Sequence, residues 1–245
     1  MKQVHLILAL VLLLTAGNPL PAQRGAAPAP QVPRAAAPID LTGYWTAIVS
    51  EDWRWRMGAG LKGDYGYLTL NPEGRKVGDT WDPARDEAAG EQCRAYGAVG
   101  VMRLPTRLHI TWENDTTLRI ETDAGTQTRT LRFGGQAPQG VEPSWQGYSV
   151  ARWDFEGPAR RAGQLRVVTT NMRPGYVYRH GVPYSGRAVL TEYLQVVPGL
   201  KGEQYLNITA TIDDPQYWAQ PFIRTIHFRR EADGSKWSPT PCSSR

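Results

Sequence analysis

Short runs rich in Val, Ile, Thr, Tyr and Trp, separated by Gly, Asn, Asp and Pro, recur along most of the chain. Turn residues fall every ten or so positions, and no stretch of about twelve or more residues has the 3.6-residue period of an amphipathic helix. This pattern predicts an all-β fold, an antiparallel barrel or a sandwich, of about ten strands. The predicted strands are 42–51, 65–70, 106–112, 116–123, 126–133, 146–155, 164–170, 187–197, 203–212 and 222–230.

Three of these runs follow one another with only short turns between them, which predicts an antiparallel meander over 107–133. One short helix is expected within 79–92, where Asp82 stands at the N-cap position and Pro83 in the first turn.

The first residues are typical of a secretory leader. Lys2 is followed by an apolar run at 6–14 and by small and helix-breaking residues up to Ala22, which predicts a signal peptide over 1–22 and a periplasmic or secreted protein. The apolar run is far shorter than the ~20 residues that cross a bilayer, so we expect no membrane insertion. Residues 23–39 are rich in Ala and Pro and predict a disordered tether, which leaves 40–245 as a single barrel domain.

The formal net charge of +5 does not indicate a nucleic-acid partner. Three of the positive charges, Lys2, Arg24 and Arg34, lie in the leader and tether, so the folded part is nearly neutral.

Cys93 and Cys242 are the two cysteines of the chain. An even pair in an exported protein predicts one disulfide, which would join the C-terminal tail to the body. The alternative, a thiol nucleophile, lacks a nearby histidine.

Alternation places one carboxylate inside. In the strand 187–197 the apolar face runs from Ala188 to Val196, and Glu192 lies in its middle; Asp214 would continue the apolar face of the next strand. A carboxylate there is paired, protonated or directed into a cavity. His109 and His227 share faces with polar residues, which predicts that both face solvent.

The segment Gly43-Tyr44-Trp45 resembles the Gly-x-Trp start of the first lipocalin strand. The resemblance implies that Trp45 closes one end of the barrel, that Arg224 lies over it, and that a disulfide ties a barrel loop to the C-terminal tail. The segments 145–153, 165–171, 190–193 and 211–215 resemble a group of bacterial secreted proteins, which implies fold and location rather than an activity. Val189 stands where many members of that group have a histidine.

The aromatic residues are mostly Trp and Tyr: nine Trp and eleven Tyr against four Phe. Several of them, with acids and arginines, cluster at 51–67, where the spacing of Trp53 and Trp55 predicts one aromatic strand face. Such rings suit an aromatic, polycyclic or sugar ligand, or else cap the barrel with Arg stacked on Trp. The residues expected to bind ligand are Trp53, Trp55, Tyr65, Arg152 and Tyr193.

Proton transfer is the chemistry that the remaining candidates allow. They are Glu192, Asp213, Asp214 and His180. Two structural alternatives stay open: Glu192 paired with Arg152 or Arg224, and an Asp-Asp-Pro turn at 213–215. The histidines are scattered, so we expect neither a metal site nor a cofactor.

The sequence therefore predicts an exported barrel that binds a small hydrophobic or aromatic molecule. The alternative is a cofactor-free acid–base enzyme, a lyase, isomerase or hydrolase, acting in the same cavity, and a third class is a structural envelope protein with a filled core. The sequence specifies neither the ligand nor the oligomeric state.

Overall fold

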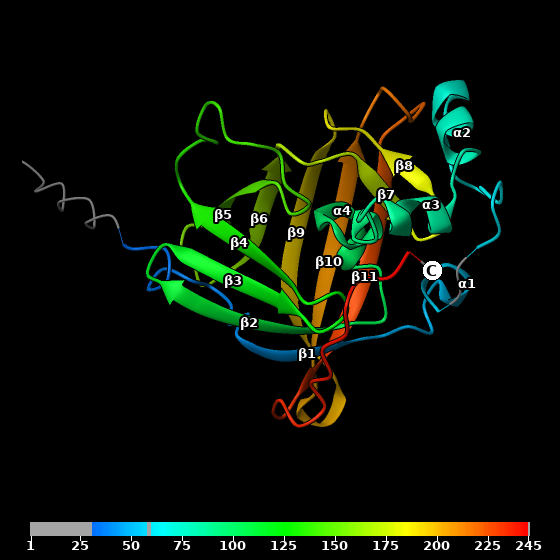
Figure 1. The fold of residues 1–245 in the computed structure, drawn as a ribbon. Helices are drawn as coiled ribbons and strands as arrows, with labels where there is room; N and C mark the ends of the chain where they lie inside the picture. Colours follow the sequence, from blue (N-terminus) through cyan, green and yellow to red (C-terminus); the bar gives the residue numbers. More distant parts are fainter. Residues whose placement is uncertain (1–30, 58–59, 245) are drawn as a thin grey trace, which may run out of the picture. The chain divides into compact units, whose positions relative to one another are not determined.

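Nine strands form a closed barrel in the computed structural model, which describes residues 31–57 and 60–244 (Figure 1). Around the barrel the order is β1-β11-β10-β9-β6-β5-β4-β3-β2, and pairing of β2 with β1 closes it. The predicted all-β barrel is confirmed, with nine strands where about ten were expected. They are β1 (Gly43–Ala47), β2 (Arg107–Asn114), β3 (Thr117–Thr122), β4 (Gln127–Phe133), β5 (Tyr148–Glu156), β6 (Ala162–Thr170), β9 (Val189–Pro198), β10 (Gln204–Asp213) and β11 (Phe222–Glu231).

Each barrel strand overlaps a predicted range, and the meander of β2, β3 and β4 is confirmed. The prediction of a strand at 65–70 is wrong. Gly66 has a left-handed φ of 47°, and only Leu70 makes a single bridge, to Trp218. The apolar side chains of this segment pack against the end of the barrel rather than on the face of a strand, so the hydrophobic run did not indicate an extended chain.

One pair of barrel neighbours is parallel, which corrects the expectation of a purely antiparallel sheet. The strands β4 and β5 run in the same direction, with Leu131 opposite Ser149. A parallel pair needs a crossover of about a dozen residues or more, and the connection 134–147 provides it. The turn signals in this connection predicted a break in the chain but not the direction of the strand that follows.

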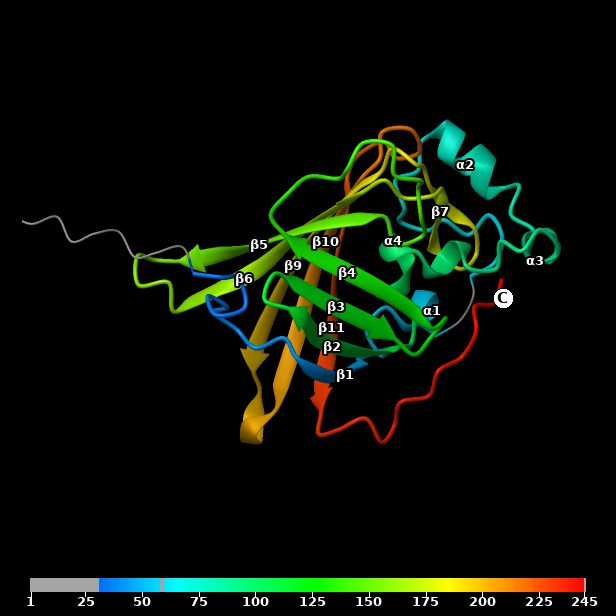
Figure 2. The same ribbon diagram turned by 60° about the vertical axis from the view of Figure 1, so that its left-hand side comes forward.

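Two insertions build a cap on one end of the barrel (Figures 1 and 2). One insertion, between β6 and β9 in the sequence, forms a two-stranded sheet of β7 and β8. This sheet packs against η1, α4 and α2. The strands β7 and β8 are buried on both faces, so they lack the alternation that identified the others. The elements of the insertions are α1 (Trp53–Arg56), α2 (Pro72–Gly78), α3 (Pro83–Ala88), η1 (Arg94–Tyr96), α4 (Ala98–Val101), β7 (Gly175–Tyr178) and β8 (Val182–Tyr184), and η2 (Leu200–Gly202) joins β9 to β10.

The helix expected within 79–92 is present as α3, shorter than that range. Asp82 caps it as predicted, because its side chain accepts hydrogen bonds from the backbone N–H groups of Ala84 and Arg85.

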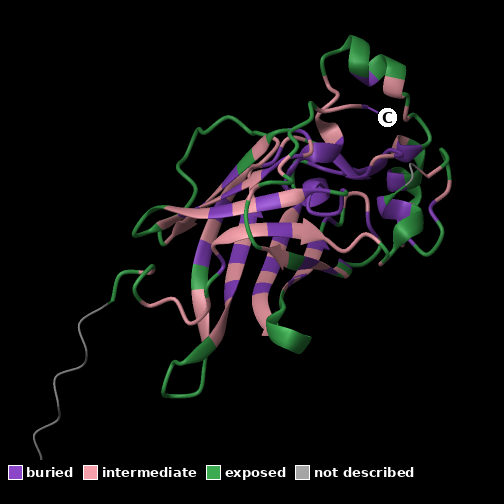
Figure 3. Cartoon of the chain, turned by 90° about the horizontal axis from the view of Figure 1, so that it is seen from below, coloured by how far each residue is buried: buried purple, intermediate pink, exposed green. Residues whose placement is uncertain are grey.

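Two large hydrophobic cores result, one inside the barrel and one beneath the cap, and a smaller cluster of Ala95, Tyr96, Leu104 and Tyr176 packs against Cys242. Buried and half-buried residues alternate along the barrel strands (Figure 3), which places every second side chain inside. The barrel core contains Trp45, Leu108, Ile120, Ile208 and Phe228, among others. The cap core contains Trp55, Leu68, Tyr184, Ile212 and Trp218, among others.

Trp45 is fully buried and lies beneath an arginine of the last strand. That arginine is Arg230, whose guanidinium is 4.3 Å from the centre of the Trp45 ring, and not Arg224 as the lipocalin resemblance implied. The register explains the correction, because Trp45 on β1 is directly opposite Arg230 on β11. Arg230 also donates hydrogen bonds to the carbonyls of Thr42 and Asp40 and so fixes the start of β1.

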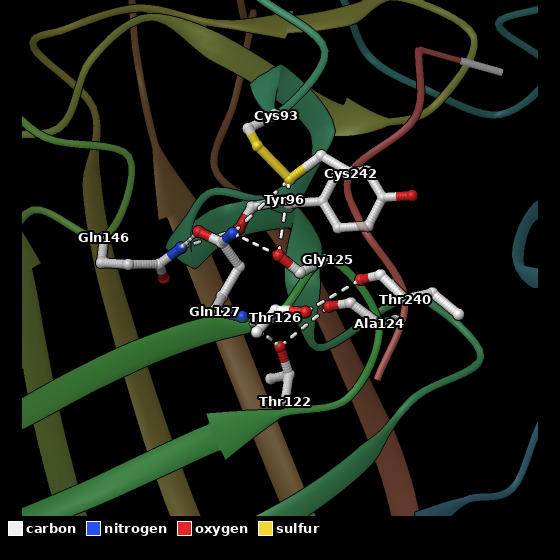
Figure 4. The surroundings of a disulfide bond; sticks show 10 residues. All are labelled: Cys93, Tyr96, Thr122, Ala124, Gly125, Thr126, Gln127, Gln146, Thr240 and Cys242. Carbon is white, nitrogen blue, oxygen red and sulfur yellow. Dashed lines mark hydrogen bonds between the residues drawn. A yellow bond between two sulfur atoms is a disulfide. The ribbon is translucent and has the colours of Figure 1, made fainter. Parts of the chain in front are cut away.

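The predicted disulfide between Cys93 and Cys242 is confirmed (Figure 4). It joins the C-terminal tail to the segment just before η1, at a sequence separation of 149 residues. Backbone bonds from the Thr240 N–H to the Asp123 carbonyl reinforce the attachment beside the β3–β4 turn.

The N-terminal part of the described chain runs along the barrel. The indole of Trp153 donates a hydrogen bond to the carbonyl of Pro33, and the backbone N–H of Arg34 donates to Asp115. The predicted signal peptide at 1–22, and residues 23–30 of the predicted tether, lie outside the described residues. Within 31–57 and 60–244, no helix has the length and apolar character of a membrane span.

Candidate functional site

Glu192 is half of an ion pair sealed inside the barrel. Its two carboxylate oxygens accept hydrogen bonds from Arg129 on β4 at 2.6 and 3.1 Å, and the two side chains are 3% and 1% exposed. Arg129 also contacts Thr169 on β6, which shares a hydrogen bond with Ser149 on β5. The pairing matches the structural alternative for Glu192, although the partner is neither of the two arginines named for it.

The neighbouring acids have structural partners. Asp214 is 1% exposed and accepts hydrogen bonds from the backbone and the hydroxyl of Ser185, both at 2.7 Å, while its own carbonyl starts the turn that leads to Trp218. Asp213 is exposed at the end of β10, opposite Val189. These contacts agree with an Asp-Asp-Pro turn, and they do not bring either acid to Glu192.

His180 lies in the turn between β7 and β8 and is 1% exposed. Its Nε2 is 3.1 Å from the carbonyl oxygen of Asp64, and its ring stacks on Trp55 at 4.8 Å. Burial lowers the pKa of His180, so the imidazole is neutral near pH 7. It therefore packs the cap core and is not brought together with Glu192.

The residues predicted to bind ligand do not form one surface. Trp53 and Trp55 lie on a helix, α1, and not on a strand, so residues two apart diverge: Trp53 is 68% exposed and Trp55 is 6% exposed. Tyr65 is buried, and its hydroxyl donates to Asp79 at 2.6 Å. Arg152 pairs with Asp154 on the outer wall of the barrel, and Tyr193 is on the face of β9 opposite to Glu192.

A pocket of about 190 Å³ opens where β1 ends, and we call it the arginine pocket. The last pair of β1 and β11 joins Ala47 to Phe228, and after a further backbone hydrogen bond from Ile48 to the carbonyl of His227 the chain leaves the sheet toward α1. The pocket is more enclosed than the surface hollows beside 231–236 and 37–42. Its walls are Glu51, Asp52, Arg56, Arg103, Arg224, Thr225, Ile226 and His227.

Two of its arginines are almost completely buried, Arg56 at 2% exposure and Arg103 at 4%. Arg56 donates from Nε to the carbonyl of Arg103 at 3.2 Å and from Nη1 to that of Ile48 at 2.9 Å, but its buried Nη2 has no partner among the described residues. The guanidinium of Arg103 is 5.2 Å from the ring centre of Phe222 and 5.8 Å from that of Tyr178, and its Nε also has no hydrogen-bond partner.

The third arginine, Arg224, is on the inner face of β11 between Phe222 and Ile226. Its guanidinium is 4.2 Å from the ring centre of Tyr67, a residue that is 49% exposed at the rim. The Tyr67 hydroxyl is 3.3 Å from the carboxylate of Asp52, and desolvation, followed by its hydrogen bond with Tyr178, raises the pKa of Tyr67. Tyr67 therefore keeps its proton and presents both a ring and a hydroxyl at the rim.

His227 and Glu51 form the fourth side of the arginine pocket. Nδ1 of His227 is 2.7 Å from the carboxylate of Glu51, and the His227 side chain is 31% exposed. Alternation correctly placed His227 on the outer face of β11, where Glu51 covers part of its ring and leaves the side chain half-buried. A carboxylate at Nδ1 fixes the ring orientation of a histidine.

Sequence patterns identified the acids and arginines at 51–67, Arg224 and His227, but they did not bring them together in one pocket. Arg103 follows α4 in a segment without a period, and Glu51 lies in the turn before α1. A signal was available for Arg224, since an arginine on the apolar face of Phe222, Ile226 and Phe228 has to meet either an acid or a cavity.

In the described ranges, no three His, Cys, Asp or Glu side chains gather closely enough to hold a metal ion. The fold and the site thus define a nine-stranded β-barrel with a charged pocket at the capped end.

Comparison with protein-family models, with curated proteins and with solved structures gave no match.

Proposed function

We propose that this chain is an exported β-barrel protein that binds a small hydrophobic or aromatic molecule at the arginine pocket. The observation that carries the proposal is the partly enclosed pocket at the end of β1, where buried donors without partners in the described chain lie near the half-exposed ring of Tyr67. Ligand sites use a few well-placed polar groups to orient a bound molecule, and here Ile226 and the Tyr67 ring are the apolar surfaces beside them.

Two further features support the proposed class. Arg230 stacked on Trp45 matches the arrangement expected from the lipocalin resemblance. One feature differs from the lipocalin class: the barrel has nine strands and one parallel pair, whereas lipocalins have eight antiparallel strands. The leader sequence and the disulfide of Cys93 with Cys242 agree with an exported location.

Binding is tested with naphthalene probes followed by calorimetry and by tryptophan fluorescence. We expect 1-naphthoate to bind, and Tyr67→Ala to weaken binding about tenfold, the equivalent of an aromatic contact of ~1–1.5 kcal/mol. The matched control is Tyr193→Ala, which removes a tyrosine from the outer face of β9, away from the arginine pocket. No binding of 1-naphthoate or its uncharged amide at roughly 1 mM would contradict the proposed function.

Export is tested by mass spectrometry of the protein recovered from the cell envelope and the medium. The leader predicts a mature chain that begins at Gln23. An uncleaved chain retained in the cytoplasm would contradict export.

A second candidate function is cofactor-free acid–base catalysis in the same pocket. The observation that favours it is His227, whose ring is oriented by Glu51 at 2.7 Å while the arginines lie across the pocket. A neutral histidine oriented in this way accepts a proton, and guanidinium groups stabilise a developing oxyanion. Hydrolysis of 1-naphthyl acetate that disappears in His227→Gln would favour the enzyme, and equal rates in the two proteins would exclude this reaction.

A further inference from the structure

The buried arginines of this protein differ in whether a carboxylate lies near the guanidinium group. In the described ranges, three arginines are more than nine-tenths buried: Arg56, Arg103 and Arg129. Arg129 has a carboxylate at 2.6 Å. Neither Arg56 nor Arg103 has a carboxylate of the described chain within 4.0 Å, and both line the arginine pocket.

An unpaired guanidinium inside a protein is costly, since burial removes its hydration without supplying a counter-charge. Two carbonyls and two aromatic rings offset part of that cost for Arg56 and Arg103. In the arginine pocket, three buried nitrogens still lack acceptors from the described chain, namely Nη2 of Arg56 and the Nε atoms of Arg103 and Arg224. Burial accordingly lowers the pKa of Arg56.

The acids of the pocket are already engaged. Glu51 accepts from His227, and the carboxylate of Asp52 is within 3.4 Å of the hydroxyls of Tyr67 and Tyr178. Three guanidinium groups therefore face two carboxylates that have other partners, which leaves an excess of positive charge and of donors.

We propose that the arginine pocket holds the oxyanion group of its ligand, a carboxylate or a phosphate, with Arg103 and Arg224 as the principal donors. This inference rests on the proposed binding function and names the class of ligand: a small aromatic acid. A volume of about 190 Å³ is below the roughly 300–1,000 Å³ of sites that enclose a drug-sized molecule, so the pocket takes the anionic group alone. The ring of the ligand then lies at the rim, against Tyr67.

The test compares pairs of ligands that differ only in charge. Calorimetry at low salt measures 1-naphthoate against 1-naphthamide, which has the same shape without the charge, and 1-naphthyl phosphate and inorganic phosphate separate the two oxyanions and the role of the ring. In the wild type we expect the naphthoate to bind about tenfold tighter than the amide, or more, as one charge-assisted hydrogen bond provides.

Two variants and one matched control locate the effect. In Arg103→Gln and Arg224→Gln we expect the preference for naphthoate over naphthamide to fall to about twofold or less. Arg229→Gln removes the same charge from the outer face of β11, next to Arg230, and should keep the full preference. Arg224 is less buried than Arg103, so its variant decides the result if Arg103→Gln fails to fold.

The outcomes separate this inference from the proposed function. Equal binding of naphthoate and naphthamide in the wild type would overturn the anion site, but it would still support the proposed binding function. If neither naphthalene compound binds but phosphate does, and Arg224→Gln abolishes it, the anion site stands without the proposed ligand. A charge preference that survives in both arginine variants, or no binding of any probe, would overturn the inference.

Discussion

Glu192 on β9 and Arg129 on β4 meet across the barrel interior at 2.6 Å, with 3% and 1% of their side chains exposed. Leu194, next on the same strand face, belongs to the barrel core, whereas Leu190 on the other side belongs to the cap core. In the sheet register Glu192 is opposite Ala210, which is itself opposite Arg224. The ion pair and the arginine pocket thus belong to one polar layer between two apolar cores.

The ion pair predicts a large stability effect for a small change. Glu192→Gln leaves Arg129 as an unpaired buried charge, so the free energy of unfolding should fall by ~3–5 kcal/mol. Denaturant melts measure this, with Glu113→Gln at an exposed position of β2 as the control. A loss below about 1 kcal/mol, as for an exposed pair, would show that Arg129 finds another partner.

The strands were predictable and the partner of Glu192 was not. Alternation along 187–197 identified Glu192 as an inward carboxylate, because a strand's side chains alternate whatever the rest of the fold does. The partner depends on which strands face each other across the closed barrel. That in turn depends on the parallel pair of β4 and β5, which no local pattern encodes.

Trp45 is fully buried in the barrel core, and its truncation is the second prediction. Trp45→Ala should lower the free energy of unfolding by ~3–5 kcal/mol, the cost of truncating a buried aromatic side chain. Trp53→Ala is the matched control, since Trp53 is 68% exposed, and it should change the stability by less than about 0.5 kcal/mol. Equal melts of the two variants would contradict the role of Trp45.

The disulfide predicts that the oxidised protein has no free thiol. Thiol titration of the unreduced, denatured protein should give none, and Cys93→Ser with Cys242→Ser should cost ~2–5 kcal/mol, because the unfolded chain is then released from a long loop. Two reactive thiols in the unreduced protein would rule the bridge out.

His180 predicts a pH dependence of stability. Because burial lowers its pKa below the ordinary 6.5, the unfolded chain binds a proton that the folded protein does not bind, in the interval between the two pKa values. The contribution of His180 is therefore complete above about pH 6.5 and is lost as the pH falls from there toward the folded pKa. Melts at several pH values should show a smaller slope in this interval for His180→Gln, and an unchanged slope would argue that His180 is protonated in the folded protein.

The arginine pocket could not be predicted from local sequence patterns. Its walls come from three separate segments, 51–56, Arg103 and 224–227. The residues at 53–55 were assigned to a strand because their two-residue spacing suits one, but four residues of helix turn Trp53 outward and Trp55 inward. A contact between segments more than a hundred residues apart follows from the closure of β1 against β11, and it leaves no local pattern.

The most direct test of the account observes the arginine side chains themselves. In a protein labelled with ¹⁵N at arginine, the Nε–H signals of Arg103 and Arg224 are assigned from their Gln variants, and 1-naphthoate is then titrated. We expect these two signals to shift together while those of Arg129 and Arg229 stay in place. Unchanged Arg103 and Arg224 signals at a naphthoate concentration that saturates binding would contradict the arginine pocket as the ligand site.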